Sequence, residues 1–159
     1  MTPTITIVKA TAQDSPDVAC MVGELLREIM DATGVQTFNF DLEKTTGRLQ
    51  DLINQEKYSV FVARDGHQGA VGFIAMVESH ALYAEGTFGT IPELYVRPEF
   101  RSRHVGLDLV AQAKIFGQSR GWKRLEVTTP PLPLFDKTLA FYEREGFSIT
   151  GGRKLKVAL

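Results

Sequence analysis

The chain has 159 residues, 43% of them apolar, with 18 basic and 19 acidic side chains and a net charge of −1. This size fits one domain, and the balanced charge argues against a nucleic-acid-binding protein, which would carry a net basic face. The apolar runs are too short to cross a bilayer, the first residues lack a secretory signal pattern, and a lone Cys20 cannot form an internal disulfide. We therefore expect one cytoplasmic domain over residues 1–159 that binds neither nucleic acid nor membranes.

The first half of the chain predicts three strands, at residues 5–9, 58–64 and 70–78. Ser15 followed by Pro16 is typical of a helix start with serine as the N-cap, and apolar residues at helical spacing extend this helix to about Met30. Residues 32–40 have no clear period and predict a loop. Asp41 can cap a second helix.

The second half predicts a strand ending at Val96, a strand at 124–128 and two short strands around Gly151 and Gly152. One helix follows Gly106 and stops at Gly121, and another covers residues 137–145 with Asp136 as its cap. The complete order indicates an α/β (α+β) fold. We expect a mixed, mostly antiparallel sheet of about seven strands flanked by about four helices.

The segment from Glu93 to Gly106 carries the strongest functional signal in the sequence. It predicts a strand that ends in a basic turn and leads directly into an amphipathic helix. Such a turn presents free backbone N–H groups and the positive end of the helix dipole, and Arg101 and Arg103 add side-chain charge there. The segment therefore predicts a phosphate-binding site.

Three segments in this order resemble the GCN5-related N-acetyltransferases, the GNAT family. Leu94 to Gly106 is similar to the family's strand, proline and Gln/Arg-x-x-Gly-x-Gly/Ala turn, and residues 124–127 are similar to its fifth strand. Residues 139–147 are similar to its Ala-x-x-Phe-Tyr-x-x-x-Gly-Phe ending, with a one-residue difference in spacing. The resemblance covers essentially the whole chain. It implies a V-shaped splay between the fourth and fifth strands, in which acetyl-CoA binds.

The resemblance also implies which residues contact the cofactor. The expected set is Leu94, Tyr95, Val96, Arg101, Ser102, Arg103, His104, Val105, Gly106 and Leu107. The strand residues would offer unpaired backbone groups to the pantetheine arm, and the turn would hold the pyrophosphate with its N–H groups. His104 stands where the family has the first glycine of its pair. Its side chain either points outward and is tolerated, which we favour because Gly106 and both arginines are retained, or obstructs the site.

Three side chains are candidates for the proton transfers of acetylation. Tyr142 matches the family's tyrosine that protonates the leaving thiolate, although it can also be a core aromatic residue beside Phe141. Glu93 and Glu126 are candidates for the base, because some family members have a glutamate at one of these places. The alternatives are a solvated strand residue for Glu93 and a surface salt bridge for Glu126. Phe135 replaces an asparagine that is frequent in the family.

The resemblance implies an acetyl-CoA-dependent N-acetyltransferase, in which a primary amine of a small molecule, peptide or protein attacks the acetyl group directly in a ternary complex. The alternatives are a divergent CoA-binding or interaction domain without robust activity, and an acyltransferase with another donor or acceptor. The histidines lack partners at metal-ligand spacing, so we expect no metal. Residues 32–40 and 80–90 are expected to shape the acceptor site, and a homodimer is left open.

Overall fold

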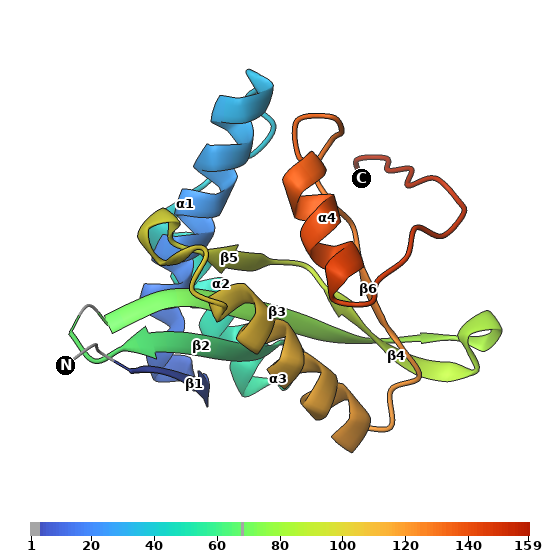
Figure 1. Cartoon of the computed structure of the whole chain (residues 1–159), viewed down its shortest axis with the longest axis horizontal. Helices are drawn as coiled ribbons and strands as arrows, with labels where there is room; N and C mark the ends of the chain where they lie inside the picture. Colours follow the sequence, from blue (N-terminus) through green and yellow to red (C-terminus); the bar gives the residue numbers. More distant parts are fainter. Residues whose placement is uncertain (1–3, 68) are drawn as a thin grey trace. The chain divides into compact units, whose positions relative to one another are not determined.

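The computed structural model describes residues 4–67 and 69–159 and divides into two units, Met1–Thr128 and Thr129–Leu159 (Figure 1). The strands are β1 (Ile5–Lys9), β2 (Ser59–Asp65), β3 (Gly69–Ala81), β4 (Gly86–Ile91), β5 (Leu94–Val96) and β6 (Leu125–Val127). The helices are α1 (Ser15–Thr33), α2 (Leu42–Asn54), α3 (Val105–Ser119) and, in the second unit, α4 (Asp136–Arg144). Short 3₁₀ turns cover Ala12–Asp14, Leu82–Ala84 and Pro98–Phe100. The expectation of a single domain stays a prediction.

The strands of the described residues form one six-stranded sheet in the order β1-β2-β3-β4-β6, with β5 also paired to β3. Every pairing is antiparallel except that of β4 with β6, which is parallel. The central strands β2 and β3 are buried over most of their length, as expected for strands covered on both faces. The predicted class, a mixed and mostly antiparallel sheet with helices, is confirmed.

Helices cover both faces of the sheet (Figure 1). Val18 and Met21 of α1 belong to one buried cluster with Val60, Val62 and Phe73 of the sheet. On the other face, Phe61 of β2 packs edge-to-face on an aromatic ring of α3, with the ring centroids 5.7 Å apart. Because side chains alternate along a strand, Phe61 and its neighbours in β2 must serve opposite faces. The helices α1 and α2 therefore lie opposite α3.

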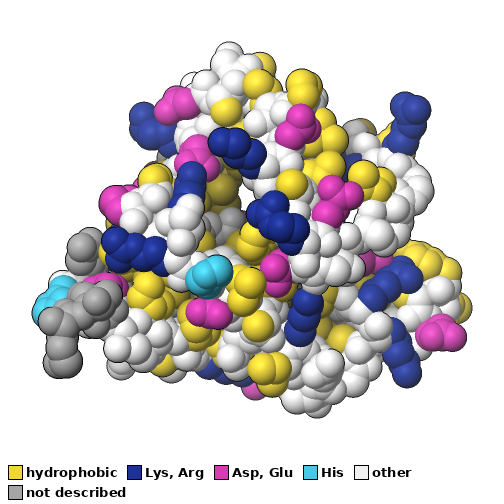
Figure 2. Space-filling view, in the orientation of Figure 1, with side chains coloured by type: hydrophobic (Ala, Val, Ile, Leu, Met, Phe, Trp, Pro, Cys, Tyr) yellow, Lys and Arg dark blue, Asp and Glu magenta, His cyan; other side chains and the backbone are white. Residues whose placement is uncertain are grey.

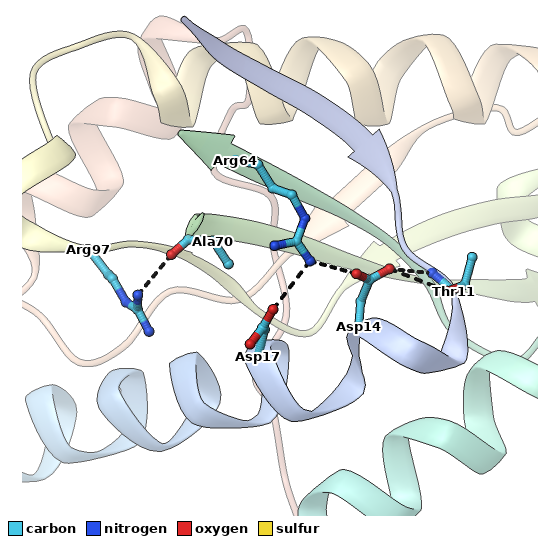
Figure 3. A network of polar contacts seen from close by, with 6 residues as sticks. All are labelled: Thr11, Asp14, Asp17, Arg64, Ala70 and Arg97. Carbon is cyan, nitrogen blue, oxygen red and sulfur yellow. Dashed lines mark hydrogen bonds and ion pairs between the residues drawn. The ribbon is translucent and has the colours of Figure 1, made fainter. Parts of the chain in front are cut away.

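The start of α1 is fixed by a polar network (Figure 3). The Thr11 amide donates to Asp14, and Arg64 of β2 donates to Asp14 at 2.6 Å and to Asp17 at 3.3 Å. Asp14, and not Ser15, is the residue that precedes the helix, because a 3₁₀ turn occupies the residues before it. The predicted cap was therefore wrong, and Ser15 is a buried first residue. The predicted cap of α2 is confirmed, since Asp41 accepts a hydrogen bond from the Lys44 amide at 2.9 Å.

The two strands expected around Gly151 and Gly152 are not formed. The described residues 148–159 are exposed, and apolar side chains such as Leu155 and Val157 bury nothing that would offset the entropy lost on ordering a strand. The strand expected to end at Val96 is instead divided into β4 and β5. In α4, Asp136 is the first helical residue and not the cap.

Basic and acidic side chains are interspersed on the face drawn in Figure 2. Within the described residues, none of the helices combines the length and apolar character that crossing a membrane requires.

Candidate functional site

The parallel strands β4 and β6 separate at the centre of the candidate site. They pair at Gly89, Thr90 and Ile91, opposite Leu125, Glu126 and Val127. Pro92 follows and has no N–H to donate, so the ladder stops there. The chain then forms β5, which among the described strands pairs only with β3. One edge of β5 is therefore open beside the end of β6, which is the expected splay.

The hydrogen-bond register shows which backbone groups face this open edge. The Ala75 amide donates to the Glu93 carbonyl at 2.9 Å, and the Arg97 amide donates to the Val71 carbonyl at 2.8 Å. In an antiparallel pair, alternate residues direct their N–H and C=O groups to the partner strand. The backbone groups of Tyr95 therefore face β3, and those of Leu94 and Val96 face the open edge. Of the three strand residues expected to offer backbone groups to the pantetheine arm, only Leu94 and Val96 have backbone groups that face the open edge.

The turn between β5 and α3 forms a cluster of free amides. Ser102 and His104 have left-handed backbone conformations, with φ of 68° and 62°, on either side of Arg103. No N–H group of residues 102–107 donates to a described backbone acceptor, and the first helical bond runs from the Asp108 amide to the His104 carbonyl at 2.9 Å. Successive amides in such a turn form a concavity that binds anions. This turn, residues 101–107, has the geometry that phosphate binding requires.

His104 is the N-cap of α3 and is exposed. This left-handed conformation favours glycine, because it costs a residue with a Cβ about 1–2 kcal/mol. His104 therefore has a strained backbone, and whether its side chain is tolerated beside a bound phosphate stays a prediction.

Replacing His104 by glycine is expected to raise the free energy of unfolding by about 0.5–1 kcal/mol, because the strain disappears while the unfolded chain gains some freedom. Urea unfolding monitored by circular dichroism measures the change. His104→Ala is the matched control: it removes the imidazole but keeps the Cβ, so its stability should not rise. Equal stabilisation by both variants would mean that the side chain, and not the backbone conformation, carries the cost.

The two arginines of the turn are used differently. The Arg101 guanidinium donates to the Val96 carbonyl at 2.8 Å and to Glu28 of α1 at 2.8 Å. Arg103 stacks on Phe100, 5.2 Å from the ring centroid, and has no acidic partner among the described residues. Arg101 therefore holds the turn against β5 and α1, and Arg103 is the better placed of the two to add charge for a phosphate. The direct contact expected of Arg101 stays a prediction.

Glu93 lies immediately before β5 and is half-buried, so it is not a solvated strand residue. Its carboxylate accepts a hydrogen bond from the hydroxyl of Tyr58, whose oxygen is 3.3 Å from each carboxylate oxygen. Burial raises the pKa of the Glu93 carboxyl, and the hydrogen bond from Tyr58 lowers it by a smaller amount. Burial, with the neighbouring Glu93 charge, also raises the pKa of the Tyr58 phenol. A carboxylate with a raised pKa is a suitable proton acceptor near neutral pH.

Glu126 lies on β6 with an exposed side chain that pairs with Arg124 at 2.7 Å. This position matches the surface salt bridge that we considered as its alternative role.

Tyr142 lies in α4, within the second unit. Its ring is buried and packs edge-to-face on Phe141 and Phe147, with both centroid distances at 5.3 Å. Burial raises the pKa of the phenol, which therefore stays protonated as an acid must. Phe141 is only half-buried, so the tyrosine and not its neighbour is the better buried residue of this pair. The role of Tyr142 as an acid stays a prediction.

Sequence reasoning missed Tyr58 and the pocket next to it. The pocket lies between α1, α2 and the sheet, and none of its lining residues comes from the segments 32–40 or 80–90. The spacing of Tyr58 and Glu93 in the sequence gives no signal, because they meet only through the pairing of β2, β3 and β5. The described residues contain no group of His, Cys, Asp and Glu side chains suited to a metal ion.

Residues 56–149 match the family profile of the acetyltransferase (GNAT) domain. The chain belongs to the GNAT family. This agrees with the amide-rich turn and the open β5 edge, which lie inside the matched region. A comparison with curated proteins gives no match.

Solved GNAT structures share the fold. A GCN5-related N-acetyltransferase from Ralstonia eutropha is 17% identical, with 97% of this chain and 99% of that chain covered and a TM-score of 0.78. A predicted acetyltransferase from Clostridium acetobutylicum, solved with acetyl-CoA, is 14% identical, with 98% and 96% covered and a TM-score of 0.76. An aminoglycoside acetyltransferase from an uncultured soil metagenomic sample, solved with sisomicin, is 19% identical, with 98% and 96% covered and a TM-score of 0.75. At these identities the likeness concerns the fold.

Proposed function

We propose that this GNAT protein is an acetyl-CoA-dependent N-acetyltransferase that acts on a primary amine. The observation that carries the proposal is the continuity of three features along one short segment. A half-buried carboxylate at Glu93 is followed by the open edge of β5 and then by the amide-rich turn at residues 101–107. The carboxylate can accept a proton from the amine, the strand edge can pair with the amides of acetyl-CoA, and the turn can bind its phosphates.

The residues present fit acetyl-CoA. The outward backbone groups of Leu94 and the outward N–H of Val96 can pair with the pantetheine arm, in the manner of an added strand, while the Val96 carbonyl accepts a hydrogen bond from Arg101. The N–H groups of residues 102–107 can hold the pyrophosphate, helped by the dipole of α3 and by the charge of Arg103. Gly106 has no Cβ between the phosphates and the backbone. When bound, acetyl-CoA supplies an acetyl group as a thioester.

In this proposal, Glu93 accepts a proton from the amine, whose nitrogen then has a free electron pair for attack. The nitrogen forms a bond to the acetyl carbon, and the bond from that carbon to the CoA sulfur breaks. Tyr142 is our candidate for the acid that would give a proton to the departing sulfur, and it would regain a proton through solvent as the nitrogen loses its second proton and the amide forms. Glu126 is the second candidate for the base. The rate depends mainly on how well the amine and the acetyl group are aligned.

The alternative is a CoA-binding domain without robust acetyl transfer. It is favoured by Phe135, which stands where the resemblance to the family implies an asparagine, and by the engagement of Arg101 with Glu28.

Titration calorimetry with CoA is expected to give saturable binding. Arg103→Ala should weaken binding about tenfold, or about 1.4 kcal/mol, through the loss of one cation near the pyrophosphate. Arg120→Ala is the matched control, because Arg120 lies at the opposite end of α3 and should leave the affinity unchanged. No binding at millimolar CoA would refute the cofactor assignment. Binding without release of free thiol, over a broad panel of amines with acetyl-CoA, would favour the alternative.

A further inference from the structure

The pocket beside Glu93 is a small chamber with apolar walls. Its volume is about 170 Å³, and it lies wholly within the unit Met1–Thr128. The walls come from α1, α2 and the sheet and include Val22, Leu49, Leu52, Val60 and Phe73. This is below the range of about 300–1,000 Å³ that holds drug-sized ligands. The pocket can therefore enclose one compact apolar group.

The polar groups of this pocket are few and are of opposite charge. Among the described residues that line it, Glu93 is the only acid, and Tyr58 donates a hydrogen bond to its carboxylate. Arg48 is the only basic residue of the same set and is exposed, so it lies at the rim. Within the described residues, Arg48 has no acidic partner. The pocket thus offers one acid, one arginine at the rim and apolar walls.

The helix α2 fixes this arrangement. Its residues Thr45, Arg48, Leu49 and Leu52 are spaced three and four apart and share one face, which turns toward the sheet. Leu49 is buried in the core, which anchors the face, and Arg48 extends from the same turn toward solvent.

The opposite wall links the pocket to the proposed cofactor site. Glu93 lines the pocket, and the next residue begins the open edge of β5. The residue that would hold the amine is therefore next in the sequence to the backbone that would bind the pantetheine arm.

We propose that this pocket is the acceptor site and that it takes a compact apolar α-amino acid. The amino group binds at Glu93, the carboxylate at Arg48 and the apolar side chain against the walls. This inference rests on the proposed function, because it names the amine that Glu93 deprotonates. A polycation such as an aminoglycoside does not suit the site, since a single buried acid and an arginine at the rim give no complement to several positive charges.

The test uses L-leucine and 3-methylbutylamine, which is the same molecule without the carboxylate. Thiol release from acetyl-CoA is expected to give leucine a kcat/KM at least tenfold above that of the amine. Arg48→Gln should lower the leucine value about tenfold or more and leave the 3-methylbutylamine value within about threefold. An Arg–carboxylate pair contributes on this scale. Because Arg48 is exposed, this variant should fold normally. Lys44→Gln makes the same charge change on α2 outside the pocket and should affect neither substrate.

Titration of leucine into the full-length protein without CoA separates this proposal from the proposed function. Leucine binding that Arg48→Gln weakens and Lys44→Gln does not, but no thiol release with acetyl-CoA, would support the pocket and refute the enzyme. Acetylation of other amines, such as sisomicin, with no leucine binding at millimolar concentration would refute the pocket and leave the enzyme. An equal effect of Arg48→Gln on leucine and on 3-methylbutylamine would also overturn the proposal, since the arginine would then not read the carboxylate.

Discussion

Replacing Glu93 by glutamine is expected to lower kcat by about 10²–10⁴-fold near neutral pH while CoA affinity stays the same. The carboxamide keeps the size of the side chain but cannot accept the proton of the amine. The deficit should shrink as the pH rises, because an alkaline solution deprotonates the amine itself. The measurement is a pH profile of kcat for both proteins. A wild-type profile for Glu93→Gln would contradict the assignment and favour Glu126 or a water molecule.

Glu126→Gln is the matched control, because it makes the same chemical change at an exposed salt bridge and should leave kcat within about twofold. Stability provides a second control. Burial raises the pKa of Glu93, so the folded state binds the carboxyl proton more tightly than the unfolded chain does. The free energy of unfolding of the wild type therefore falls as the pH rises from the carboxyl pKa of the unfolded chain to the raised pKa of the folded state. Glu93→Gln carries no charge to bury, so at neutral pH it should be at least as stable in urea as the wild type. A loss of activity then cannot come from unfolding.

Tyr142→Phe is expected to lower kcat by about 10²–10⁴-fold with little change in CoA affinity, through the loss of the acid that protonates the departing sulfur. The ring should keep its packing against Phe141 and Phe147, so unfolding in urea should change little. Tyr83→Phe removes a hydroxyl from an exposed ring and serves as the control. If kcat stays the same under conditions in which chemistry limits the rate, Tyr142 has only a packing role.

Local signals in the sequence predicted most of the elements. The cap at Asp41 depends on a contact three residues away, and the basic turn before α3 depends on residues that adjoin it, so both could be read from the chain. The break at Pro92 was missed because a proline is also compatible with the edge of a continuous strand. The absent strands around Gly151 and Gly152 were missed because pairing depends on a partner strand, which the local pattern does not reveal.

The site divides in the same way. The anion-binding character of residues 101–107 follows from composition, although the left-handed conformations of Ser102 and His104 do not. The contact between Tyr58 and Glu93 joins residues 35 positions apart and depends on the register of two strand pairings. The engagement of Arg101 with Glu28 likewise depends on where α1 lies, so the sequence gives no sign that this arginine holds the turn in place.

The open edge of β5 has a consequence for the solubility of the protein. An unpaired strand edge is a template to which other chains can add, and this is a common route to aggregation. Here the unpaired stretch is only three residues long, and prolines lie on both sides of it at Pro92 and Pro98. Neither proline can donate a hydrogen bond to an added strand, so a foreign chain would lose its pairing after a few residues. The same edge is long enough for a short arm with two amides, so the prolines leave room for a small ligand and exclude a strand.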